Sequence, residues 1–230
     1  MGCALSGLDQ TPSSLWGELS PGESRWPAAV AILATIGLQI ALPEALTFGS
    51  RWMLPIIELA LLVTLVVVNP TRLHRESTDL RIVSLMLVAL LTAANGVALV
   101  LLLDQLVAPK ATLAGRTLLS SGVVIWATNV ISYGVWYWEI DRGGPIRRCH
   151  PDHRAPDFMF PQMENPGLKA GPWTPNFLDY LYVSLTNSTA FSPTDTLPLT
   201  RRVKALMAVQ AICSLATVVV VGARAVNILG

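Results

Sequence analysis

Hydrophobic residues along the chain gather into five long blocks separated by polar segments. The blocks cover about residues 26–46, 52–68, 82–103, 117–138 and 203–229. Each block is too long and too evenly apolar for a strand, and none alternates polar and apolar positions with a period of two. Because about 20 apolar residues cross the hydrocarbon of a bilayer as a helix, the pattern predicts five transmembrane helices.

A shorter apolar segment, residues 176–190, lies between the fourth and fifth blocks. Pro175 precedes it and Pro193 follows it, which favours a helix that begins after the first proline and ends before the second. The segment is apolar enough to be buried but too short to span, as is typical of re-entrant helices. We therefore expect an all-α, polytopic membrane protein with five transmembrane helices and one re-entrant helix between the fourth and fifth.

These elements divide the chain into four parts. A polar N-terminal segment, 1–25, precedes a four-helix transmembrane region, 26–138. A Pro- and Gly-rich loop, 139–175, leads to the last part, 176–230, which holds the re-entrant helix, a turn and the last transmembrane helix. On this topology, twelve of the 16 Lys and Arg residues share the side of the N-terminus and the long loop. The positive-inside rule predicts that this side is cytoplasmic.

Composition supports a membrane protein and excludes some partners. The chain is 52% hydrophobic and 13% charged, whereas soluble domains carry about 25% charged residues. Its net charge of +1 provides no field that would gather nucleic acid, so we expect no nucleic-acid partner. The three cysteines are too few and too scattered for a disulfide framework.

Glu58 lies within the second predicted span, and three further polar residues lie near the middles of theirs: Asn95, Asn129 and Gln210. An ionisable residue within a membrane is by default a candidate for function, which singles out Glu58. The alternative is that Glu58 lies shallow and either reaches the interface or pairs with Arg51. Hydrogen bonds between helices are an adequate explanation for the two asparagines and the glutamine.

A weak metal-binding pattern occurs in the long loop, where Cys149, His150 and His153 stand close together. Their residue types suit zinc, but standard sites space their ligands more widely and add a second pair elsewhere. No nucleophile elbow, phosphate-binding loop or zinc-protease motif is present. We therefore expect no metal site, no cofactor and no enzymatic activity.

The segment 182–201 resembles the pore module of tetrameric potassium channels. In that module a short pore helix is followed by a Thr-Val-Gly-Tyr-Gly-Asp filter and an Asp-x-x-Pro-x-Thr continuation. Thr189 stands near the filter threonine, and Asp195, Pro198 and Thr200 match the continuation. A looser likeness to a family of uncharacterised bacterial integral membrane proteins covers most of the chain; it rests on Thr-Ala-Phe-Ser-Pro-Thr-Asp195 and on the Ala-Arg-Ala-Val-Asn-Ile-Leu ending.

These resemblances imply a channel-like protein of the bacterial inner membrane, in contact with lipid, that forms a homo-oligomer with a tetramer favoured. The residues implied to form the filter-like turn are Thr186, Asn187, Ser188, Thr189, Ala190, Phe191, Ser192, Thr194 and Asp195. The glycines that let a potassium filter align its carbonyls are absent here. Selection among monovalent cations would then depend on side chains.

Two other functions fit the same sequence. One is a non-conducting scaffold or sensor with the same architecture, and the other is a membrane enzyme or transporter that uses Glu58. The side on which residues 139–200 lie is also open, because the charge count indicates the cytoplasm whereas channel filters face outward.

Overall fold

The computed structural model describes residues 23–68, 78–107, 113–149, 155–165, 167, 173–192 and 195–229. These residues form seven α-helices, three short 3₁₀ helices and one pair of two-residue strands, so the predicted all-α class is confirmed. Three helices are long and apolar enough to cross a membrane: α4 (Thr78–Val107), α5 (Gly115–Ile140) and α8 (Arg201–Leu229). Two apolar helices are shorter, α2 (Trp26–Ala41) and α3 (Met53–Val68). These lengths and compositions are those of a membrane protein.

The first predicted span is wrong at its C-terminal end. Helix α2 stops at Ala41 rather than at residue 46, and Leu42 is extended, as residues before proline usually are. Pro43 then leads into a 3₁₀ turn, η1 (Glu44–Leu46). The third predicted span is too short at its C-terminal end, because α4 continues past Asp104 to Val107.

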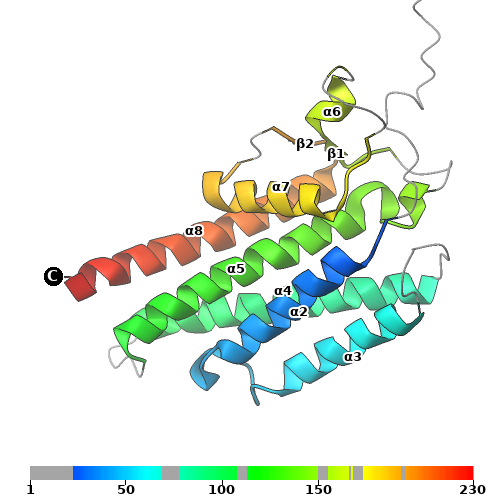
Figure 1. Ribbon diagram of the computed structural model, residues 1–230. Coiled ribbons are helices and arrows are strands. Elements are labelled where there is room, and N and C mark those ends of the chain that lie inside the picture. Colours follow the sequence, from blue (N-terminus) through cyan, green and yellow to red (C-terminus); the bar gives the residue numbers. More distant parts are fainter. Residues whose placement is uncertain are drawn as a thin grey trace, which may run out of the picture.

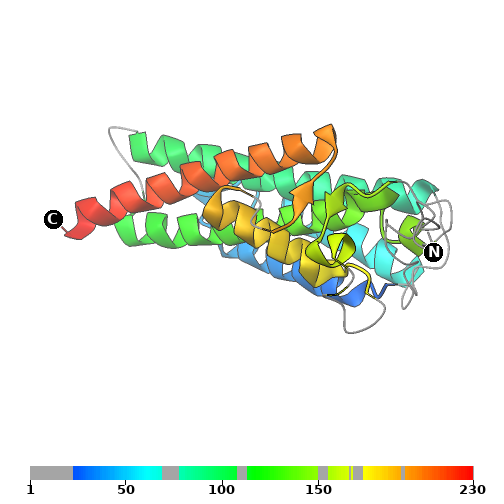
Figure 2. The same cartoon turned by 90° about the horizontal axis from the view of Figure 1, so that it is seen from above.

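The long helices lie side by side in an elongated bundle (Figure 1). Helix α5 is central to it and packs against α2, α4, α7 (Phe177–Ala190) and α8. The approach of α7 depends on Gly134, where a Cβ would lie 3.1 Å from the Cα of Leu181. Seen from above, α7 lies over α5 and beside α8 (Figure 2).

The two ends of the bundle differ in their polar contacts. At one end Glu23, which precedes α2, accepts a hydrogen bond from Trp138, and Arg81 at the start of α4 approaches the carbonyl oxygen of Glu139 at 3.5 Å. At the other end Arg51 donates to the carbonyl of Ile40 at 2.6 Å. The start of α2, the start of α4 and the end of α5 therefore share one end, as the five-span topology expects.

The segment expected to be a Pro- and Gly-rich loop contains several short elements. They are η2 (Asp141–Gly143), η3 (Arg147–Cys149), β1 (Phe158–Met159) and α6 (Pro161–Glu164). Strand β1 pairs antiparallel with β2 (Leu197–Pro198), with Phe158 opposite Pro198. The described part of this segment thus packs against the end of the bundle where α8 begins.

Candidate functional site

Helix α7 begins near the end of α5 and packs along it on the outside of the bundle (Figure 1). Asn176 caps its N-terminus in a capping box with Asp179. Tyr180 contacts Asp141, just past the end of α5, whereas Ser184 donates to the carbonyl of Val130 at 2.6 Å. Helix α7 therefore runs antiparallel to α5, and at Ser184, six residues before its end, it has reached about 15 Å along that helix, at 1.5 Å per residue.

The two faces of α7 have different surroundings. Residues at helical spacing on its inner face are buried against α5 and α8: Phe177, Tyr180, Val183, Ser184, Asn187 and Ser188. The apolar residues of the outer face are exposed: Leu178, Tyr182 and Leu185. The inner face therefore fixes α7 within the chain, and the outer face is left uncovered by it.

Gln210, one of the polar residues singled out in the sequence, joins three helices. Its Oε1 accepts hydrogen bonds from Asn187 Nδ2 at 2.8 Å and from the hydroxyl of Tyr137. Its Nε2 donates to Ser188 Oγ at 2.7 Å and to Ser184 Oγ at 2.6 Å. Since Gln210 is fully buried, these bonds replace the water that its amide has lost. The network fixes the depth of α7 relative to α5 and α8.

The structure divides the predicted filter-like residues into two sets. Asn187 and Ser188 face the protein interior, and Thr186 is half-buried with its hydroxyl bonded to the carbonyl of Val183. The exposed members lie at the end of α7 and just after it: Thr189, Ala190, Phe191, Ser192 and Asp195. Thr194 lies outside the described residues.

Phe191 ends α7 in an unusual conformation. Its φ of 55° and ψ of 21° are left-handed, a region that costs residues with a Cβ about 1–2 kcal/mol. Glycine is the residue that most often occupies this position at the end of a helix. The side chain of Phe191 is 41% exposed, so contacts within the described chain cover only part of it.

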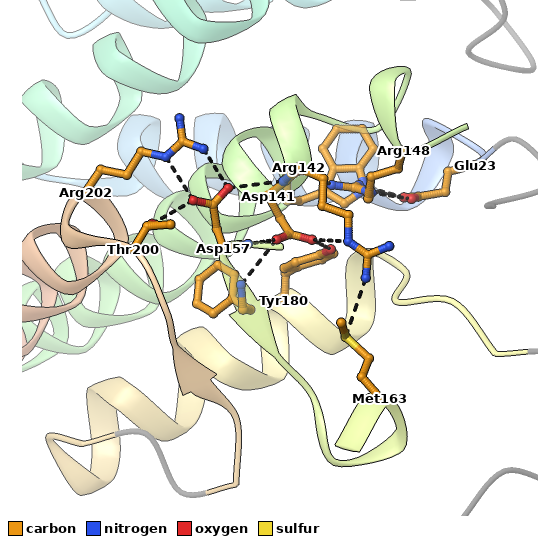
Figure 3. Close-up of polar contacts among 11 residues, drawn as sticks. Glu23, Asp141, Arg142, Arg148, Asp157, Met163, Tyr180, Thr200 and Arg202 are labelled. Atoms are coloured by element: carbon orange, nitrogen blue, oxygen red, sulfur yellow. Dashed lines mark hydrogen bonds and ion pairs between the residues drawn. The ribbon is translucent and has the colours of Figure 1, made fainter. Parts of the chain in front are cut away.

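At the other end of α7 lies a buried cluster of charges, which we call the Asp141–Asp157 cluster (Figure 3). Asp141 Oδ1 accepts from the backbone amides of Asp157 at 2.7 Å and Phe158 at 3.3 Å. Its Oδ2 accepts from the hydroxyl of Tyr180 at 2.7 Å. Asp141 thereby ties the end of α5 to β1 and to the first turn of α7.

Asp157 makes the corresponding connection to α8. Its carboxylate is fully buried and binds Arg202 through two hydrogen bonds, of 2.9 and 2.7 Å. Thr200 donates to the same carboxylate at 2.6 Å, and the amide of Arg142 donates at 3.1 Å. Paired Arg–carboxylate bonds of this kind set orientation as well as strength. The start of α8 is thus held at the level where α7 begins.

Arg148 completes the cluster on the side of α2. Its Nε lies 2.8 Å from Glu23 Oε1, and its Nη1 donates to the carbonyl of Trp138 at 2.8 Å. Burial disfavours its charged form, but the electrostatic interactions with Tyr180, Glu23 and Asp141 outweigh burial and raise the pKa of Arg148. Arg148 therefore remains a buried cation whose charge is balanced by its neighbours.

The other residues predicted from the sequence are the polar residues of the spans, which lie apart from the turn that follows α7, and the metal candidates. Asn129 donates to Ser214 Oγ at 2.9 Å, and Asn95 is buried on α4. Glu58 is fully buried on α3 and forms no ion pair with Arg51, so the alternative of an Arg51 partner does not hold. Among the described residues no group of three or more His, Cys, Asp or Glu is placed to hold a metal ion. The side chain of Cys149 and the whole of His150 and His153 lie outside the described residues.

The Asp141–Asp157 cluster could not be predicted from the sequence. Its two carboxylates stand 16 positions apart and the arginine that binds Asp157 stands a further 45 away. No local spacing marks such a set, because β1 and β2 bring its members together. The one usable signal was the position of Asp141 directly after an apolar block.

Comparison with protein-family models, with curated proteins and with solved structures gives no match to this chain.

Proposed function

We propose that this is a channel-like integral membrane protein, in which copies of the chain assemble around the end of α7 and conduct monovalent cations. In this proposal α2 and α3 also span the bilayer, α7 is a re-entrant helix, and the assembly is a symmetric tetramer. The resemblance of residues 182–201 to the pore module of potassium channels supports this proposal.

The observation that carries the proposal is the depth at which α7 ends. Ser184 meets Val130 ten residues before the end of α5, and Asn187 meets Gln210 nine residues after the start of α8. With the bundle in a bilayer about 30 Å thick, the exposed residues that follow lie near the middle of the hydrocarbon. Exposed non-helical backbone is not stable against lipid and needs protein or a water-filled path beside it.

A second copy of the chain would cover part of this backbone with protein, and a water-filled axis would hydrate the rest. In a ring of four copies, one surface of each chain packs against a different surface of the next, and identical residues converge on the axis. The exposed outer face of α7, with Leu178, Tyr182 and Leu185, offers apolar area for such packing. Around the axis, Thr189, Ser192 and Asp195 would then provide oxygen atoms.

The direction of α7 favours cations over anions. The last carbonyls of a helix have no partner within the helix ladder, and the C-terminal end of α7, with the negative end of the helix dipole, points toward the turn. Rings of acidic side chains select cations in channels, and Asp195 is an exposed carboxylate in this region. Hydroxyl and carboxylate oxygens, rather than a row of glycine carbonyls, would replace the hydration shell of the ion.

The test combines a subunit count with ion flux. Native mass spectrometry in mild detergent should give a tetramer, and liposomes containing the protein should pass K⁺ or Na⁺. Asp195→Asn should lower that flux several-fold, whereas Asp104→Asn, which neutralises an exposed carboxylate near the far end of α4, should leave it unchanged. A stable tetramer without flux would support the non-conducting scaffold instead, and a monomer in several lipids would contradict the shared axis.

A further inference from the structure

Glu58 is a buried carboxyl without a hydrogen-bond partner. It lies on the inner face of α3 with Pro55, Leu62 and Leu65, and its side chain has no exposed surface. Neither of its carboxyl oxygens makes a hydrogen bond. An ionised carboxylate in such a place lacks both water and a counter-charge, which costs several kcal/mol.

A polar side chain of the neighbouring helix α2 lies beside Glu58. Gln39, on α2, faces the carboxyl, and its own Nε2 also lacks a completed hydrogen bond. Helix α2 carries no titratable residue, and the part of α4 beside this region presents Ala94, Val97 and Ala98. No charged group among the described residues faces Glu58 from α2, α3 or α4.

An amide is suited to either protonation state of a carboxyl. Its N–H donates to a carboxylate, and its oxygen accepts from a protonated acid. Gln39 can therefore stabilise Glu58 before and after a proton is lost, with a rotation of the amide between the two states. A fixed cation at this position would instead favour only the ionised form.

A small pocket connects Gln39 with the end of the bundle formed by the α2–α3 connection. It has a volume of about 30 Å³, enough for a water molecule, and it is lined by Gln39, Pro55 and the polar residues Thr47, Ser50 and Arg51. Arg51 is held by the carbonyls of Ile40 and Leu42 at 2.6 and 3.4 Å. The pocket gives water a route to the amide that faces Glu58.

From this geometry we infer that Glu58 is a proton-binding site, which is neutral at rest and exchanges its proton through Gln39 and the pocket at the Arg51 end. The ligand is the proton itself. The site lies between α2, α3 and α4, away from the turn that follows α7. It is therefore independent of oligomer formation and of ion conduction through a central axis.

Chemical labelling tests the inference directly on the full-length protein in lipid nanodiscs. Dicyclohexylcarbodiimide reacts with protonated carboxyls in apolar surroundings, and peptide mapping by mass spectrometry locates the product. We expect Glu58 to be labelled at low pH and progressively less as the pH rises. Glu44, exposed near the same end, should stay unlabelled and is the internal control. Protection of Glu58 by Na⁺ at constant pH would contradict the inference, because the site would then take a metal cation.

A stability measurement keeps the inference testable if the reagent fails to reach the site. Glu58→Gln places a neutral side chain of nearly the same shape at this position. The variant should equal the wild type in thermal stability at low pH, and the wild type should become the less stable of the two as the pH rises. A variant that is less stable than the wild type at every pH would show that Glu58 is ionised and paired, and would overturn the inference.

Discussion

The polar groups at the two ends of α7 differ in burial and in pairing. At its start, Asp141, Asp157 and Arg148 are almost fully buried, and each is bonded to several groups of the same chain. At its end, Thr189 and Ser192 are exposed at a depth set by the Gln210 network. Buried polar groups stabilise a single arrangement only when every one of them is paired. The start of α7 is therefore a structural junction, and its end is an exposed surface, which in our proposal meets a second copy and ions.

The largest effect should come from the junction. Asp141→Ala removes the acceptor for two backbone amides and for the hydroxyl of Tyr180, and leaves these donors buried. We expect a loss of about 3–5 kcal/mol in the free energy of unfolding. Asp195→Ala, at the exposed end, should change it by less than about 0.5 kcal/mol. Thermal unfolding in one detergent compares both variants, and equal losses would remove the distinction between the two ends.

A smaller loss should follow from the network that sets the depth of α7. Gln210→Ala leaves Asn187, Ser188 and the hydroxyl of Tyr137 without their shared partner. We expect a loss of about 2–4 kcal/mol, with Val219→Ala, at an exposed position of the same helix, as the control. Hydrogen exchange should also become faster at the C-terminal turn of α7. Unchanged exchange there would mean that the network does not hold α7 in place.

The smallest effect concerns the turn itself. Phe191→Gly relieves the left-handed backbone and should be about 1 kcal/mol more stable than Phe191→Ala, since both variants lose the same ring. Phe191→Ala keeps the Cβ and so keeps the strain. A higher melting temperature for the glycine variant than for the alanine variant is the expected result. Equal melting temperatures would show that the backbone at this position costs nothing.

The sequence predicted the helices better than it predicted their connections. Helix α7 was located to within one residue, because Pro175 and Asn176 mark its start and its apolar positions follow helical spacing. The end of α2 was misplaced by five residues, because a long apolar block conceals the break that Pro43 imposes. The hydrophobic pattern predicts the presence of helices well, but it gives little information about the residue at which one helix ends and its connection to the next begins.

The same contrast holds for the polar residues. Gln210 and Glu58 could be singled out because a polar side chain inside an apolar block is unusual. Their partners could not, since Tyr137 lies 73 positions from Gln210 and only packing brings them together. Asp141 and Asp157 lie in a segment rich in polar residues, where a buried carboxylate has no distinguishing pattern.

Disulfide crosslinking in native membranes tests the central claim, that the end of α7 meets other copies of the chain. The test uses a chain in which Cys3, Cys149 and Cys213 are replaced by serine and a single cysteine is introduced. Ser192→Cys should give disulfide-linked dimers on mild oxidation. Val63→Cys, at an exposed position of α3, should remain monomeric. A monomer at residue 192, or equal crosslinking at both positions, would contradict the account.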